Sequence, residues 1–78
     1  MTQQELREEI RTIQRIFRTP HSKIAQICNE SGLFPVKMYR TNISTFMCNE
    51  DYILGKNQYD ALKWFVETRK ELAKKYLK

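Results

Sequence analysis

The sequence predicts an all-α fold, a small domain of four to five helices, and three observations support this prediction. Apolar residues recur at spacings of three and four along most of the chain, which is the helical period. The 2 glycines and 2 prolines among 78 residues are too few for a β-rich fold with many tight turns. The length suits one domain, so we expect residues 1–78 to form a single unit.

The first predicted helix spans residues 3–17. Its apolar side chains follow the spacing i, i+4, i+7 and i+11 and therefore share one face; they are Leu6, Ile10, Ile13 and Phe17. Glutamates near its start and arginines near its end match the helix dipole. Pro20 has no backbone N–H to donate, so we expect the helix to end before it.

The second predicted helix spans about residues 20–31. Either Thr19 is its N-cap and Pro20 its first residue, or Ser22 caps a later start. Three side chains are expected to point into the core: Ile24, Ile27 and Cys28. Gly32 then supplies a residue that adopts the left-handed conformation at a helix end.

The third predicted helix spans residues 35–48, with Pro35 at its first position. Its apolar side chains lie within one arc of about 100°; they are Val36, Tyr39, Ile43, Phe46 and Met47. Polar side chains occupy the opposite flank: Lys37, Arg40, Thr41, Ser44 and Thr45. After a polar loop, Asn57 is expected to cap a last helix over residues 57–77.

Composition and motifs exclude several classes of function. The net charge of +5 favours a polyanion as partner, because each neutralised phosphate releases counterions. The chain has a single histidine, no glycine-rich phosphate loop and no nucleophile motif, so we expect no enzymatic activity, no cofactor and no small-molecule substrate. Cys28 and Cys48 are isolated and are expected to be half-buried apolar residues rather than metal ligands. No apolar run is long enough to span a membrane, and we expect a cytoplasmic protein.

The second and third predicted helices form the pattern of a helix-turn-helix: a short helix, a turn with a glycine, and a helix with a polar outer flank. Such a helix fits a DNA major groove about 12 Å wide, where short hydroxyl side chains permit close approach. The candidate DNA-binding residues on the third helix are Lys37, Arg40, Thr41, Asn42, Ser44 and Thr45, with Asn42 between the two flanks. Ser22 and Lys23 are added because the start of the second helix offers backbone N–H groups to a phosphate.

Two stretches resemble the lambda-repressor/Cro-like helix-turn-helix regulators of phages and plasmids. One is Ile43-Ser44-Thr45-Phe46, followed by Leu54 and by Tyr59, Leu62 and Phe65 on the next helix. The other is the segment from Ser22 to Ile27, and the resemblance covers about residues 20–66. It implies a sequence-specific regulator of transcription that binds duplex DNA, of phage or mobile-element type.

The chain departs from that family in the spacing of its motif. The family places an alanine four residues before the turn glycine, whereas Ala25 precedes Gly32 by seven. One register therefore aligns on Ile43 and implies a long turn or an early start of the third helix. The other aligns on Gly32, with Cys28 at the small-residue position and Met38 at a core position of the third helix.

Two further expectations concern partners. A monomer of this size contacts about one half-site, so operator binding implies a homodimer, with the C-terminal helix as its interface. The residues expected there are Trp64, Ala73, Tyr76 and Leu77. The alternative function is a small helical protein-interaction module that binds a host or viral regulator without DNA. The DNA hypothesis requires residues 35–48 to be helical with their polar flank uncovered.

Overall fold

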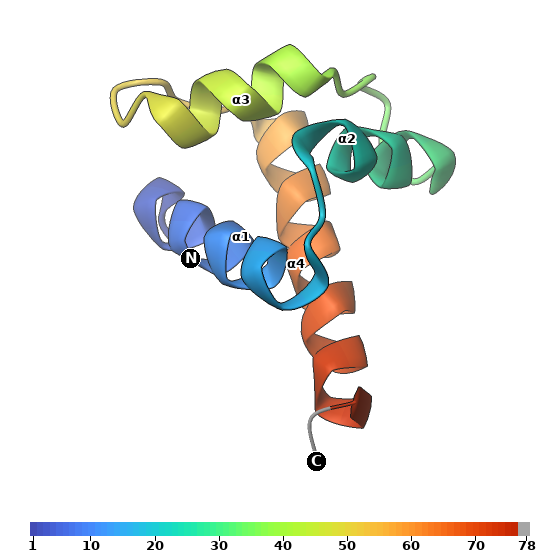
Figure 1. Cartoon of the computed structure of the whole chain (residues 1–78). Coiled ribbons are helices and arrows are strands. Elements are labelled where there is room, and N and C mark those ends of the chain that lie inside the picture. The colour runs from blue at the N-terminus through green and yellow to red at the C-terminus, as the bar shows by residue number, and fades with distance from the viewer. Residues whose placement is uncertain (77–78) are drawn as a thin grey trace.

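The computed structural model describes residues 1–76 and contains four helices (Figure 1). They are α1 (Gln3–Phe17), α2 (His21–Glu30), α3 (Arg40–Cys48) and α4 (Lys56–Tyr76). No strand occurs among these residues, so the predicted all-α class is confirmed. No helix in this part of the chain combines the length and apolar character that crossing a membrane requires.

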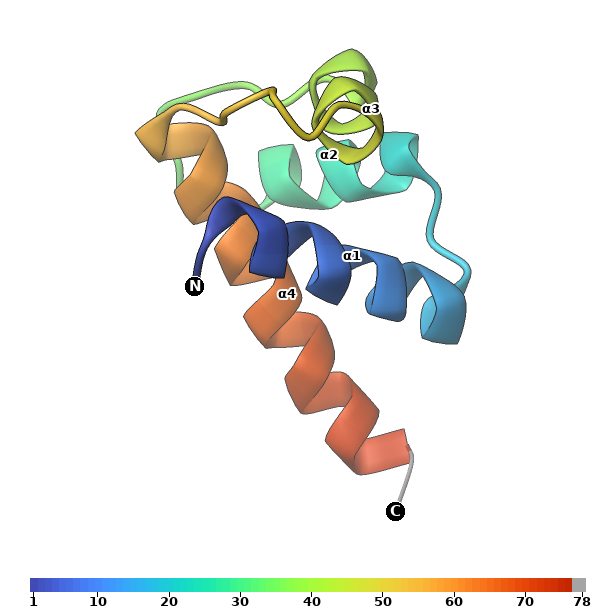
Figure 2. The ribbon, with the colours of Figure 1, turned by 90° about the vertical axis from the view of Figure 1, so that its left-hand side faces the viewer.

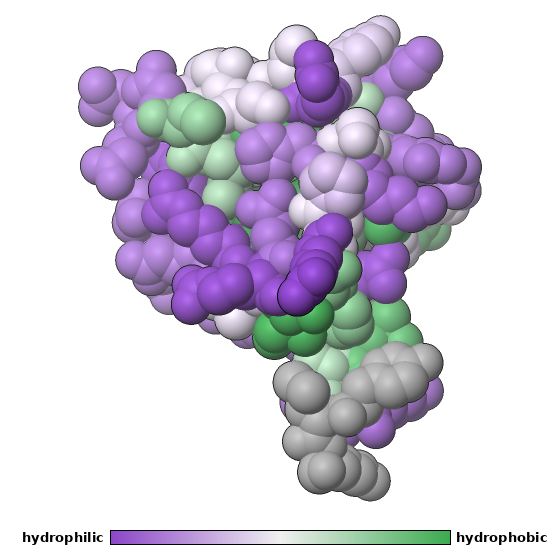
Figure 3. Space-filling view, in the orientation of Figure 1, coloured by the Kyte–Doolittle hydropathy of each residue, from purple (hydrophilic) through white to green (hydrophobic). Residues whose placement is uncertain are grey.

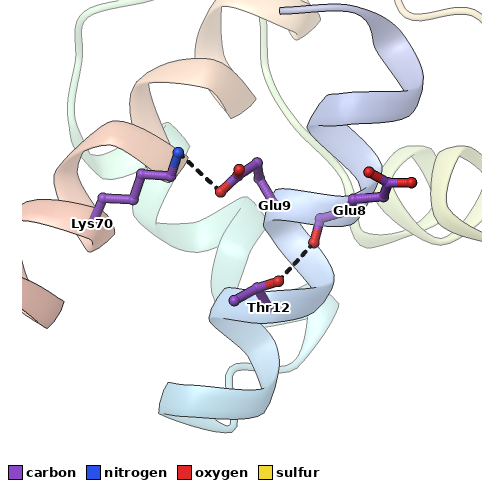
Figure 4. A network of polar contacts seen from close by, with 4 residues as sticks. All are labelled: Glu8, Glu9, Thr12 and Lys70. Carbon is purple, nitrogen blue, oxygen red and sulfur yellow. Dashed lines mark hydrogen bonds and ion pairs between the residues drawn. The ribbon is translucent and has the colours of Figure 1, made fainter. Parts of the chain in front are cut away.

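The long helix α4 is the axis of the molecule, and α1 and α2 pack against it. α3 packs on α2 (Figure 2). α3 therefore forms one end of the molecule, while the later turns of α4 project from the opposite end (Figure 1). An ion pair of 3.0 Å between Lys70 and Glu9 joins α4 to α1, close to the bond from the Thr12 hydroxyl to the Glu8 carbonyl (Figure 4).

The core lies where the four helices meet. Its fully buried side chains are Leu6, Ile10, Ile24, Met38, Ile43, Phe46, Leu62, Phe65 and Val66. Most of these are the periodic apolar residues of the sequence, which the hydrophobic effect removes from water as the helices pack. Ile13, Cys28 and Met47 are also buried, as their helical spacing predicts.

The predicted start of the third helix is wrong, and the requirement that residues 35–48 be helical is met only over Arg40–Cys48. α3 begins at Arg40 instead of Pro35, and residues 31–39 form a long connection without helix. The Asn29 side chain explains this difference, since it bonds to both backbone groups of Met38: Oδ1 accepts from N–H at 2.7 Å and Nδ2 donates to the carbonyl at 2.8 Å. Tyr39 is extended and 55% exposed, so it lies outside the apolar arc predicted for it.

The other helix ends differ by one residue or agree, but α4 begins at Lys56, so Asn57 lies in its first turn and is not the N-cap predicted for it. α1 has the predicted bounds, and the Thr2 hydroxyl accepts from the Glu5 N–H at 3.1 Å as an N-cap. Pro20 precedes α2 as its N-cap residue instead of being its first helical residue. Gly32 has a φ of +67°, the left-handed conformation expected after a helix. Cys28 is buried as expected, but Cys48 is exposed, which corrects the expectation for that residue.

Candidate nucleic-acid interface

The C-terminal end of α3 is held by a buried arginine of α1. Arg7 is only 2% exposed, and its Nε donates to the Phe46 carbonyl at 2.7 Å. Its Nη2 donates to three further carbonyls after α3, those of Asn49, Glu50 and Tyr52, at 2.6 to 3.1 Å. The guanidinium also lies 4.3 Å from the centre of the Phe46 ring. Unpaired carbonyls at a helix end attract positive charge, so Arg7 both satisfies and fixes this end of α3.

A second arginine of α1 adds to this anchor. Arg11 donates from Nη2 to the Met47 carbonyl at 3.1 Å, one turn after Arg7. Sequence reasoning missed both roles, because arginines on an amphipathic helix are usually solvated. The available signal was position: Arg7 borders the apolar stripe of Leu6 and Ile10.

The N-terminal end of α3 is closed by its own residues. The Oδ1 atom of Asn42 accepts from the Tyr39 N–H at 3.2 Å, and the Asn42 N–H donates to the Tyr39 carbonyl at 3.0 Å. Asn42 is half-buried, and its amide oxygen takes part in this cap. If that oxygen contacted DNA instead, the hydrogen bond from the Tyr39 N–H would be lost.

One side-chain bond joins α3 to the start of α2. Nδ1 of His21, the first residue of α2, lies 2.8 Å from the Ser44 hydroxyl oxygen. Both side chains are half-buried. Ser44 was predicted to be a free hydroxyl on the polar flank, but the structure pairs it with His21.

The exposed part of α3 is a stripe of short side chains. Thr41, Thr45 and Cys48 are all exposed and follow at i, i+4 and i+7, so they share one side of the helix. We call these three residues the outer face of α3. Arg40 is exposed at the first position of the helix, beside this face. Cys48 was absent from the predicted site, although its spacing from Thr41 and Thr45 places it there.

The remaining predicted residues lie around α3. Lys37 is exposed but belongs to the connection before the helix, with its ammonium 5.5 Å from the centre of the Tyr39 ring. Ser22 and Lys23 are exposed in the first turn of α2. Pro20 offers no side-chain acceptor to that turn, and its carbonyl accepts from the Lys23 N–H at 3.0 Å, so the N–H groups of His21 and Ser22 are the ones left for an external acceptor.

The charged residues of α3 and of the first part of α2 are positive, whereas Glu30 ends α2 and Glu50 and Asp51 follow α3. Residues 18–29 and 40–48 contain no aspartate or glutamate, and they carry Arg18, Lys23 and Arg40. The surface at the α3 end of the molecule is mostly pale to purple in Figure 3, with one light green patch at its left, and darker green apolar surface gathers lower on that face, beside the projecting part of α4. The outer face of α3 is therefore polar, short and free of negative charge.

The connection between α2 and α3 carries a different surface. A shallow pocket of about 390 Å³ is lined by Asn29, Phe34, Pro35, Val36 and Lys37. The Phe34 ring packs edge to face on Trp64, with ring centres 5.9 Å apart. Leu33 beside it is 62% exposed. The connection between α2 and α3 therefore exposes apolar side chains, whereas the outer face of α3 is polar.

Within the described residues, no three His, Cys, Asp or Glu side chains gather as a metal site. Comparisons with protein-family models, with curated proteins and with solved structures found no match to this chain.

Proposed function

We propose that the protein is a sequence-specific regulator of transcription that binds duplex DNA with α3 in the major groove. The observation that supports this most is the outer face of α3: exposed, without acidic residues, and bordered by Arg40 at the N-terminal end of the helix. Recognition helices contact base edges mainly with residues near that end. Hydrogen bonds from Arg7 of α1 and His21 of α2 tie α3 to its neighbours, so the helix is presented in one orientation.

The proposed roles follow from side-chain chemistry. Arg40 donates in a bidentate manner to a guanine, and the methyl groups of Thr41 and Thr45 contact thymine methyls. Ser22 and Lys23, with the leading N–H groups of α2, bind a backbone phosphate and set the register. Lys37 lies outside the helix, so its role is limited to a phosphate contact, and Asn42 serves the cap of α3.

The proposed kinship with lambda-repressor/Cro-like regulators needs a longer linker than that motif usually has. A helix-turn-helix turn has about 3–4 residues, whereas residues 31–39 separate α2 from α3 here. The two hydrogen bonds from the Asn29 side chain to the Met38 backbone, which we call the Asn29 clamp, compensate for this length. They fix the connection, as a tight glycine turn does in the shorter motif. This arrangement favours the register on Ile43 with an elongated turn.

A homodimer through α4 remains part of the proposal, since one copy of α3 covers about one half-site. Ala73 is half-buried on the projecting part of α4. Trp64 packs on Phe34 within the same chain, which makes it a weaker interface residue. Leu77 and the Tyr76 side chain lie outside what the structure describes.

The second candidate function is a protein-interaction module. The exposed Leu33 and the pocket along residues 34–37 favour it, because exposed apolar patches mark contact sites for other proteins. A substitution separates the two functions: Leu33→Ser leaves DNA binding intact under the first and abolishes partner binding under the second.

The test of DNA binding begins with selection of duplexes from a random pool. Affinity for the selected duplex is expected to fall steeply with salt. Arg40→Ala is expected to weaken it by about 5- to 150-fold, the value of a good bidentate base contact. The matched control is Arg15→Ala, an exposed arginine at the end of α1, which is expected to leave affinity within about twofold at fixed salt. The proposal is wrong if no duplex is enriched at low salt, or if both variants behave alike.

A further inference from the structure

His21 is the only histidine of the chain, and its ring lies at the junction of α2 and α3. Its Nδ1 atom is 2.8 Å from the hydroxyl of Ser44, one turn after Arg40 and next in sequence to Thr45 of the outer face. The state of this ring therefore controls a hydroxyl at the edge of the proposed DNA-reading surface.

Which partner donates in the His21–Ser44 hydrogen bond depends on which ring nitrogens of His21 carry a proton. In a neutral imidazole one nitrogen donates and the other accepts. When Nδ1 accepts, Ser44 donates its single O–H to the ring and has only lone pairs left for other partners. In the imidazolium both nitrogens donate, so Nδ1–H donates to Ser44 and the Ser44 O–H becomes free to donate elsewhere.

We propose that His21 acts as a pH-dependent positioning residue, which switches Ser44 from hydrogen-bond acceptor to hydrogen-bond donor toward DNA. This inference rests on the proposed function. The charged residues within four positions of His21 or Ser44 are all positive: Arg18 before α2, Lys23 on α2 and Arg40 on α3. The nearest acidic residues along these segments are Glu30, at the far end of α2, and Glu50, after α3. A proton on His21 adds to their mutual repulsion in the free protein, and a DNA phosphate offsets that repulsion. Duplex binding therefore takes up a proton and strengthens as the pH falls.

The DNA arm of the test uses two variants. His21→Asn keeps a polar group near the Nδ1 position but does not titrate, and Ser44→Ala removes the switched hydroxyl. For the native chain, affinity for the selected duplex is expected to rise about fivefold from pH 7.5 to pH 5.5, the effect of one charge near a phosphate. His21→Asn removes only the imidazole, so the rise in affinity is expected to be absent from its profile.

Duplex selection at the two pH values tests the role of Ser44. The native chain is expected to select a different base pair at one position, because donor and acceptor recognise different groove edges. Ser44→Ala and His21→Asn are each expected to select the same duplexes at both pH values. A pH profile that survives His21→Asn, or a pH-dependent selection that survives Ser44→Ala, overturns the inference.

A second arm needs no DNA. The ring nitrogen resonances of a single histidine are unambiguous in NMR spectra, and Ser44→Ala is expected to shift the Nδ1 resonance and the tautomer balance. An unchanged ring in Ser44→Ala contradicts this inference alone and leaves DNA binding standing. A ring that responds in a protein that binds no duplex contradicts the proposed function, and the proposed switch with it.

Discussion

Replacing Arg7 should lower the stability of the fold much more than is usual for a charged residue on an amphipathic helix. Arg7→Met keeps the aliphatic stem and removes the guanidinium, so it isolates the hydrogen bonds that hold α3. The bond to the Phe46 carbonyl is buried, and a lost hydrogen bond to a charged group costs about 1.5–3 kcal/mol. The other three carbonyls lie in the partly exposed segment after α3 and regain water.

The stacking of the guanidinium on the Phe46 ring contributes about 1 kcal/mol more. We therefore expect Arg7→Met to lower the free energy of unfolding by about 2.5–4 kcal/mol. A domain of 78 residues has only about 4–12 kcal/mol in total, so the variant should lose a large fraction of its stability. Arg7→Lys should lose about half as much, since an ammonium lacks the planar fork that reaches several carbonyls.

Urea denaturation followed by circular dichroism and by the fluorescence of the single tryptophan, Trp64, measures this loss. The matched control is Arg15→Met, an exposed arginine of the same helix, which is expected to change stability by less than about 0.5 kcal/mol. If Arg7→Met loses less than about 1 kcal/mol, the carbonyl contacts do not anchor α3 and the reasoning fails.

Asn29→Ala should lower stability by about 1–3 kcal/mol and speed amide hydrogen exchange at Met38, because both backbone bonds of the clamp are lost; unchanged exchange would contradict the clamp. Burial raises the pKa of Cys28 to about 11 from its ordinary 9.0, so the exposed Cys48 should react first with a thiol reagent. Equal reaction rates for the two thiols in mass spectrometry would refute this. Because the folded state holds the Cys28 proton more tightly, stability should decline as the pH rises from about 9 through 11, a decline that Cys28→Ala lacks.

The periodicity of apolar residues predicted most of the fold. α1 and α4 follow their patterns closely, because each buries one continuous stripe, such as Leu6, Ile10 and Ile13 of α1. A buried stripe on one helix appears in the sequence as apolar residues at regular spacing, so the spacing alone is enough to find such helices.

The start of α3 could not be predicted in this way. Val36 and Tyr39 continue the helical spacing of Ile43 toward the N-terminus, but the Asn29 clamp holds the connection extended. That bond joins residues nine positions apart through a side chain, and no periodic pattern records it. Tertiary hydrogen bonds of this kind override local preference.

The candidate site was likewise predicted only in part. Arg40, Thr41 and Thr45 are exposed on α3 as their helical positions imply. The pairing of Ser44 with His21 depends on how α2 packs on α3, which the sequence does not specify. The burial of Arg7 was equally hidden, since its carbonyl partners follow it by 39 to 45 positions.

The most direct test of the central claim is an NMR titration of the isotope-labelled protein with its selected duplex. DNA binding by α3 predicts that the largest amide shifts map to Arg40, Thr41 and Thr45 and to the first turn of α2. Shifts confined to residues 33–37, or to the projecting turns of α4, would contradict it.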